Sequence, residues 1–240
     1  MNIAVVFAGG TGKRMNTRSK PKQFLEMHGK PVLVYTLEIF QNHPMIDKII
    51  LVCFEPWIEY AKSLLKKYFI DKVCYVILGG DSGQESIFNG IKVAHEEFPD
   101  ESTVLIHDGV RPLIDEDTIT ACIQTVEQYG NAITVAPAIE TIFLKDPGTN
   151  QVGTIFNRAY CEMAKAPQCF KLSDIYQTHC KAIREGQDDF IDSAQLMQYY
   201  GFSLYTVEGP SENIKITTPS DFYIFRAIMD AKESLQILGL

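Results

Sequence analysis

The chain has 240 residues, 46% of them hydrophobic, and a formal net charge of −8 at pH 7. This length allows one α/β domain or two smaller ones, and the hydrophobic fraction is ample for a packed core. The acidic balance argues against non-specific binding to nucleic acid or to anionic membranes. We therefore expect neither partner, and we expect local groups of basic residues to hold a small anionic ligand.

Targeting signals and cysteine patterns give two further expectations. No signal peptide precedes the first predicted strand, and no apolar run is long enough to span a membrane, which predicts a cytoplasmic protein. The cysteines show neither a CxxC pair nor a zinc spacing, so we expect reduced packing residues. The six are Cys53, Cys74, Cys122, Cys161, Cys169 and Cys180.

Strand and helix patterns alternate regularly over the first 136 residues. Strands are predicted at Ile3–Phe7, Asp47–Phe54, Lys72–Leu78, Thr103–His107 and Ala132–Ala136. Helices are predicted at Pro31–Phe40, Trp57–Tyr68, Ser86–Glu97 and Asp117–Tyr129. This alternation predicts an α/β fold with a mostly parallel, doubly wound sheet.

The regular alternation of predicted strands and helices ends after Pro137. Thr141–Leu144 and Val152–Phe156, separated by a turn at Asp146-Pro147-Gly148, predict a hairpin that forms an arm at about residues 138–160 of a single domain spanning residues 1–240. Further helices are predicted at Leu172–Glu185, Ser193–Tyr200 and Ser220–Ala231, with a strand at Phe202–Glu208. Because an arm cannot bury both faces on its own body, we expect a homodimer.

A glycine-rich, basic loop follows the first strand directly. Glycines let a ligand approach the backbone N–H groups closely, and the basic side chains add charge, so the combination favours a nucleotide-phosphate site. The spacing matches neither a Walker A loop nor a GxGxxG fingerprint, and an ordinary strand-to-helix turn would also produce it. The candidate residues are Ala8, Gly9, Gly10, Thr11, Gly12, Lys13, Arg14 and Lys22.

Polar residues also follow the later strands, at the sheet edge where ligands of open α/β folds bind. Gly80, Asp81 and Ser86 offer backbone amides, a carboxylate and a hydroxyl, or else form a plain turn. Asp108 and Arg111 form either a local ion pair or a site for a metal or a substrate hydroxyl. The neighbouring histidine, flanked by apolar residues, is expected in the core.

Two further basic residues stand out. Arg158 lies at the end of the predicted arm. Lys215 interrupts an apolar alternation, which indicates either a snorkelling side chain or a phosphate clamp.

Together these motifs resemble the family of cytidylyltransferases that make CDP-linked polyols, which includes enzymes for 2-C-methyl-D-erythritol 4-phosphate and for ribitol 5-phosphate. The resemblance covers essentially the whole chain. The matching stretches are AGGTGKRM, PKQF, GGD with a following Ser, HDGVRP, the Thr141 region, NRAY, APQCF, IDSA and NIKITTPSD. It implies a Rossmann-like fold, a homodimer joined by the arm, Mg²⁺, and transfer of CMP from CTP to a polyol phosphate.

The resemblance also implies roles for individual residues. The cytidine would be held by Ala8, Gly9, Gly10, Gly80, Asp81 and Ser86. Arg14 and Lys22 would grip the CTP phosphates, with Lys215 at the reaction centre. Asp108 and Arg111 would line the substrate and metal region, while Thr141 and Arg158 of a partner subunit would orient the polyol phosphate.

The chain departs from the family pattern on the nucleotide side, where Gly83 removes a cation, and at the acceptor, where Ala166 bears on the choice of substrate. Gly83 stands where the family commonly has Arg, and Ala166 where it commonly has Thr, a hydroxyl that faces the substrate phosphate. We therefore expect ribitol or arabinitol 5-phosphate, used for teichoic-acid or capsule polymers, rather than the methylerythritol substrate of isoprenoid synthesis. The same glycine loop and fold would also suit a non-catalytic nucleotide-binding module or a sugar-1-phosphate nucleotidyltransferase.

Overall fold

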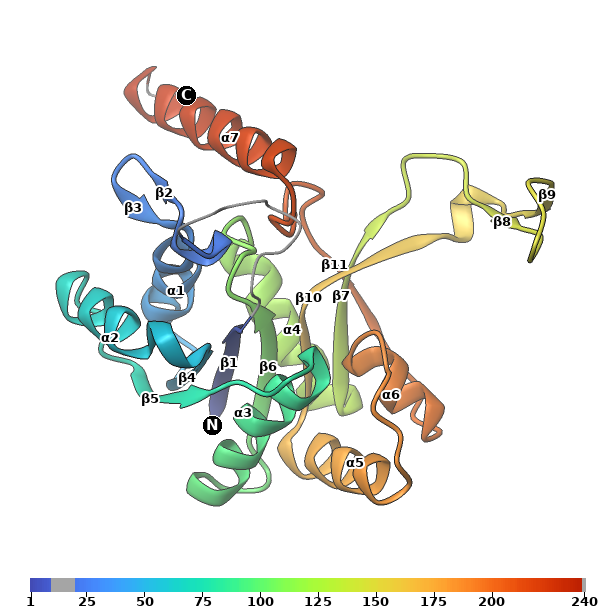
Figure 1. The fold of residues 1–240 in the computed structure, drawn as a ribbon, viewed down its shortest axis with the longest axis horizontal. Helices are drawn as coiled ribbons and strands as arrows, with labels where there is room; N and C mark the ends of the chain where they lie inside the picture. Colours follow the sequence, from blue (N-terminus) through green and yellow to red (C-terminus); the bar gives the residue numbers. More distant parts are fainter. Residues whose placement is uncertain (10–19, 239–240) are drawn as a thin grey trace.

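A seven-stranded sheet forms the centre of the computed structural model, which describes residues 1–9 and 20–238 (Figure 1). The strand order is β11-β7-β10-β6-β1-β4-β5. The strands are β1 (Asn2–Ala8), β4 (Lys48–Cys53), β5 (Val73–Leu78), β6 (Thr103–Asp108), β7 (Asn131–Pro137), β10 (Glu162–Lys171) and β11 (Thr206–Glu208). All neighbours pair in parallel except β10, which runs antiparallel to both β6 and β7. The predicted mostly parallel α/β sheet is confirmed.

Helices cover both faces of this sheet, as a doubly wound fold requires. The helices are α1 (Val32–Asn42), α2 (Ile58–Lys67), α3 (Gly83–Glu97), α4 (Glu116–Tyr129), α5 (Leu172–Arg184), α6 (Ser193–Tyr199) and α7 (Pro219–Leu238). Side chains of β1 show the two layers: Ala4 and Val6 pack with α1, α2 and α4, while Ile3 and Val5 pack with α3, α5 and α6. The alternation of the strand therefore builds two separate cores.

Smaller elements complete the chain. The short strands β2 (Glu26–Met27) and β3 (Lys30–Pro31) pair with each other, and 3₁₀ turns lie at Lys22–Phe24, Glu55–Trp57 and Arg158–Tyr160. None of the helices within residues 1–9 and 20–238 has the combined length and hydropathy needed to cross a membrane. All six cysteines are free thiols, and three of them (Cys53, Cys122 and Cys169) are buried.

The predicted hairpin is present. Strands β8 (Phe143–Lys145) and β9 (Val152–Ile155) pair antiparallel, and Figure 1 shows them at the end of an arm that extends away from the sheet. The long strand β10 returns from the arm into the sheet.

Several predicted elements differ from the observed ones. The strand β10 was not predicted, because it contains Pro167, which lies where the pairing register with β7 shifts. Helix α3 begins three residues before Ser86, since the side chain of Ser82 caps it by accepting a hydrogen bond from the Glu85 N–H. The predicted strand at 202–208 is formed only over its last three residues, and α7 continues seven residues beyond its predicted end.

Candidate active site

Two cavities adjoin at the carboxyl edge of the parallel strands. The first, which we call the glycine-loop cavity, has a volume of about 420 Å³ and is lined by Gly9, Lys22, Gly80 and Asp81 among others. The second, the α5–α6 cavity, has a volume of about 510 Å³ and extends to side chains of α5, α6 and the segment between them. Both cavities are lined by Phe7, Ser82, Gly83, Asp108 and Lys215, which therefore lie at their junction.

Ser86 joins the two loops that wall the glycine-loop cavity. Its buried hydroxyl accepts a hydrogen bond from the Gly80 N–H at 3.0 Å. A Cβ at Gly9 or at Gly79 would lie only 3.3 or 3.1 Å from the same hydroxyl oxygen. The absence of side chains at these glycines thus lets the two loops approach each other across Ser86.

Lys22 is positioned at this cavity by its two neighbours in the sequence. The amide of Gln23 donates a hydrogen bond of 2.7 Å to the carbonyl of Ala8, at the end of β1. The fully buried ring of Phe24 stacks on Trp57, with 5.0 Å between the ring centroids. The PKQF stretch therefore ties Lys22 to the sheet edge on one side and to the α2 layer on the other.

An ion-pair cluster lies at the junction of the cavities. One oxygen of Asp108 lies 2.6 Å from Nζ of Lys215, and the other accepts a 2.8 Å hydrogen bond from Nε of Arg111. Burial raises the pKa of the Asp108 carboxyl, but the charges of Lys215 and then Arg111 outweigh burial, so its pKa lies below the usual value. Asp108 is thus a charged residue that holds two cations in place.

Hydrogen bonds from the loop that precedes α7 hold this ion-pair cluster in position. Nη1 of Arg111 donates to the carbonyl of Asn213 at 2.8 Å, and the buried Asn213 amide donates to the carbonyl of Ala166 at 2.7 Å. The N–H of Ile216 donates to the carbonyl of Val110. These bonds place Lys215 beside Asp108, which accounts for a lysine within an apolar alternation.

Sequence reasoning missed several residues of the α5–α6 cavity. Lys165 is half-buried in the irregular part of β10, and its pKa is lowered first by burial and then by the charge of Arg111. The wall opposite contains Gln84, Gln168, His179 and Asp192. Two signals pointed to this wall: the stretches APQCF and IDSA, which contain Gln168 and Asp192, carry the family resemblance, and Asp192 caps a helix by accepting from the Gln195 N–H.

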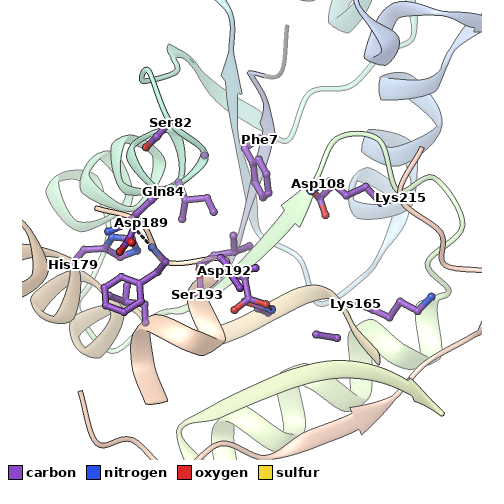
Figure 2. Close-up of a pocket in the computed structure, with 18 of the residues that line it drawn as sticks. Phe7, Ser82, Gln84, Asp108, Lys165, His179, Asp189, Asp192, Ser193 and Lys215 are labelled. Atoms are coloured by element: carbon purple, nitrogen blue, oxygen red, sulfur yellow. Dashed lines mark hydrogen bonds and ion pairs between the residues drawn. The ribbon is translucent and has the colours of Figure 1, made fainter. Parts of the chain in front are cut away.

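Opposite charges occupy opposite sides of the α5–α6 cavity. Figure 2 shows Lys215 and Lys165 on one side, with His179 and Asp189 on the other. The cations Arg111, Lys165 and Lys215 outnumber the single carboxylate of Asp108 in their part of the lining. This side is suited to a phosphate group.

Most of the predicted site residues that the structure describes come together here. Those lining at least one of the two cavities are Ala8, Gly9, Lys22, Gly80, Asp81, Ser86, Asp108, Arg111 and Lys215. Gly10, Thr11, Gly12, Lys13 and Arg14 lie outside the described residues. Thr141 and Arg158 are exposed on the arm and line neither cavity of their own chain, and Arg158 donates to the carbonyl of Ile139.

Of the two departures from the family pattern, only Gly83 lines the cavities. Gly83 lines both of them and has open space where a side chain would be. Ala166 is buried, and its carbonyl accepts the Asn213 hydrogen bond described above. The buried residue His107, as expected, belongs to the core, where its ring contacts Phe40 edge-on.

The donor set around Asp108 suits a metal ion that arrives with phosphate groups. Within the described ranges, no group of three ligating side chains is found, and both oxygens of Asp108 already face cations. Mg²⁺ commonly takes only one or two protein carboxylates and fills its remaining positions with substrate phosphate oxygens and water. The residues therefore fit Mg²⁺ carried by a nucleotide triphosphate better than a metal held by the protein alone.

Comparisons with known proteins agree with this geometry. The model of the IspD family, 2-C-methyl-D-erythritol 4-phosphate cytidylyltransferase, matches residues 2–231. A ribitol-5-phosphate cytidylyltransferase from Vibrio parahaemolyticus is 51% identical over 239 residues, covering 100% of each chain. A 2-C-methyl-D-erythritol 4-phosphate cytidylyltransferase from Clostridium botulinum is 38% identical, covering 95% of this chain and 97% of that protein.

The comparison with solved structures gives a consistent result. The crystal structure of 4-diphosphocytidyl-2C-methyl-D-erythritol synthase from Anaerococcus prevotii has a TM-score of 0.82 and 29% identity, and the match covers 95% of this chain and 96% of that one. The chain therefore belongs to the IspD family of cytidylyltransferases, which are nucleotidyltransferases.

Proposed function

We propose that the chain transfers CMP from CTP to a pentitol 5-phosphate, ribitol 5-phosphate foremost, and releases a CDP-pentitol and pyrophosphate. The observation that carries the proposal is the position of Lys215 and Asp108 at the junction of two cavities. The glycine-loop cavity would hold CTP, and the α5–α6 cavity would hold the acceptor. Their phosphate groups would then meet beside Lys215.

In this reaction an oxygen of the acceptor phosphate attacks the α-phosphorus of CTP. The bond from that phosphorus to the bridging oxygen breaks, and pyrophosphate leaves with the electron pair. Both reacting groups are anionic, so fixed cations are needed to offset their repulsion and the charge that develops. Lys22 and Lys215 are the described residues that we assign to this task, with Arg14 in the segment before them.

Neither a covalent nucleophile nor a general base is required, because a phosphate monoester oxygen is already ionised near neutral pH. Mg²⁺, when bound with the CTP phosphates next to Asp108, would supply further charge stabilisation. The role of Asp108 itself is to hold Lys215 and Arg111 in position and to receive acceptor hydroxyls. We propose that the reaction takes place in the cytoplasm.

The name of the 51% identical Vibrio relative supports ribitol 5-phosphate as the acceptor. The second candidate acceptor is 2-C-methyl-D-erythritol 4-phosphate, which the family model and the 38% identical Clostridium relative carry in their names. The alanine at position 166, where the family commonly has a threonine hydroxyl, also favours the first candidate.

A panel of acceptors tests the proposal. Pyrophosphate release is measured with CTP and Mg²⁺ and with the phosphates of ribitol, arabinitol, methylerythritol, glycerol and mannitol. We expect turnover with a pentitol phosphate. Turnover of methylerythritol phosphate alone would show that the second candidate is right, and no turnover with any of them would contradict the proposal.

We also propose that two copies of the chain form the active dimer and that each arm reaches the cavity of the other copy. Support comes from the arm's apolar residues, each at least 40% exposed in the single chain, namely Ile139, Phe143, Leu144, Val152, Ile155 and Phe156. Such a patch is typical of a protein interface. Thr141 and Arg158 would thereby contact the polyol phosphate bound to the partner subunit.

Mixing two inactive variants tests this arrangement. Arg158→Ala and Lys215→Met are each assayed alone and after the two proteins are unfolded and refolded together. If the arm acts on the partner, a mixed dimer contains one site with both residues intact, so activity should return to about a quarter of wild type. No recovery would contradict an arm that acts across the dimer.

A further inference from the structure

His179, on helix α5, is a buried polar residue that the reaction described above does not use. Its side chain is 1% exposed, and neither ring nitrogen has a hydrogen-bond partner among the residues that the structure describes. One face of the ring stacks on Phe88, with 5.5 Å between the centroids. The ring also lines the α5–α6 cavity (Figure 2).

The chemical state of this ring limits what it can bind. Burial lowers the pKa of His179 to about 4, so the imidazole is neutral at neutral pH. A neutral imidazole has one N–H donor and one nitrogen acceptor. A hydroxyl group can satisfy either one, whereas an ammonium group can only donate and a phosphate dianion can only accept.

The neighbouring polar side chains are already engaged. Gln168 accepts from the Ala194 N–H at 2.9 Å and donates to Asp192 at 2.8 Å. Gln84 accepts from the Phe190 N–H and donates to the carbonyl of Gln187. These amides hold the segment between α5 and α6, which lines the same cavity as His179.

The charges along the cavity indicate which kind of molecule fits. Cations lie on the side of Lys215, while the exposed carboxylates Asp188 and Asp189 belong to the side of His179. A phosphate would be repelled from the acidic side, and an apolar chain would leave the imidazole unsatisfied. A molecule with a phosphate at one end and hydroxyls along the rest matches both sides.

We propose that His179 is a specificity-determining residue that binds the distal hydroxyls of the polyol chain while the cations hold its phosphate. This inference rests on the proposed function, since it concerns the acceptor of that reaction. It assigns the selection of a long hydroxylated chain to the α5–α6 wall. The alanine at position 166, where the family commonly has a threonine, is a separate difference.

The variant His179→Leu tests the proposal, because leucine keeps the apolar packing and removes both ring nitrogens. We expect KM for ribitol 5-phosphate to rise about tenfold, as for the loss of one or two hydrogen bonds, with a smaller change in kcat. KM for CTP should not change. Inhibition by inorganic phosphate, which has no hydroxyl chain, should also be unaffected.

Two further variants separate binding from structure. Thr178→Val alters the adjacent buried residue, whose hydroxyl bonds to the Asp174 carbonyl and does not line the cavity, so its KM values should match wild type. His179→Asn restores a donor and an acceptor and should recover part of the affinity. Thermal unfolding of each variant shows whether the fold is intact.

The outcomes are distinct. An unchanged KM for ribitol 5-phosphate in folded His179→Leu, or an equal rise in Thr178→Val, would overturn the hydroxyl subsite and leave an imidazole that is simply part of the core. Failure of the wild-type protein to turn over any polyol phosphate would instead overturn the proposed function. Calorimetric titration of ribitol 5-phosphate into wild type and His179→Leu judges the subsite even in that case, by whether the affinities differ.

Discussion

The two cavities have walls of different kinds. In the glycine-loop cavity, backbone groups of Gly9 and Gly80 approach one another around Ser86, and the tolerance for added atoms is small. In the α5–α6 cavity, the wall consists of side chains from α3, α5, β10 and the segment before α6. Closely approaching backbone leaves little room for change in the part of the wall that it forms, whereas single substitutions can reshape a wall of side chains. This contrast is what we expect of a family whose members share a nucleotide and differ in the acceptor.

The largest predicted effects concern Lys215, at the junction where both ligands would meet, and Lys22, in the glycine-loop cavity. Lys215→Met, and likewise Lys22→Ala, should lower kcat by about 10²-fold or more, which corresponds to the roughly 3 kcal/mol of a lost preorganised charge. Steady-state kinetics with CTP and ribitol 5-phosphate measure this. Lys62→Ala, which removes an exposed cation paired with Glu59 on α2, is the control and should have little effect. Near-normal turnover in both active-site variants would refute the roles assigned to them.

The second prediction concerns two buried histidines, of which His107 lies in the core and His179 in the side-chain wall. Burial lowers the pKa of both from 6.5 to about 4. In the unfolded chain each imidazole takes up a proton below about pH 6.5, whereas in the folded chain it does so only below about pH 4. The free energy of unfolding should therefore be highest above pH 6.5. It should fall as the pH is lowered, by roughly 2 kcal/mol per histidine at pH 5.

Urea unfolding of wild type and His179→Leu at pH 7 and pH 5 checks this expectation. The variant should lose about half of the pH dependence that the two histidines cause. If the two proteins had the same pH dependence, burial would not hold His179 neutral in the folded state, and the α5–α6 wall would gain a positive charge at pH 5.

The smallest effect is predicted at the glycine-loop wall. A Cβ at Gly80 would lie 2.3 to 2.6 Å from side-chain carbons of Glu85, whose carboxylate accepts the Asp81 N–H. Gly80→Ala should displace this loop and raise KM for CTP about tenfold, with KM for the acceptor unchanged. Lys92→Ala is the control, because this exposed residue of α3 lines neither cavity, so its KM values should match wild type. Similar KM values for the two variants would show that the wall is not as intolerant as we infer.

The sequence predicted the parallel core of the fold because each of its strands is a short run of apolar residues followed by a helix of regular period. It did not predict β10, in which lysine, proline and glutamine interrupt the pattern. Those interruptions have a structural cause, since the strand changes register with β7 between Ala164 and Gln168. Two of the three residues that interrupt the pattern, Lys165 and Gln168, line the α5–α6 cavity.

The candidate site was predictable to a similar degree. Residues at strand ends, such as Asp81 and Asp108, were found because the topology places all such ends at one edge. The pairing of Asp108 with Lys215 was not predictable, since the two residues are 107 positions apart and meet only through the loop that follows β11. His179 gave no sequence signal, because a histidine on the buried face of an amphipathic helix looks the same whether or not it lines a cavity.

The hydrogen bond from the Gln23 amide to the Ala8 carbonyl lowers the entropic cost of binding a nucleotide. The two residues are 15 positions apart, and their bond brings the two ends of the intervening segment together. Closing a loop of this length costs about 2 kcal/mol of chain entropy beyond a constant. The protein meets that cost when it folds, through the packing of Phe24 on Trp57, so an arriving nucleotide need not meet it again. Part of the affinity that we propose for a triphosphate at Lys22 should therefore depend on the aromatic pair of Phe24 and Trp57.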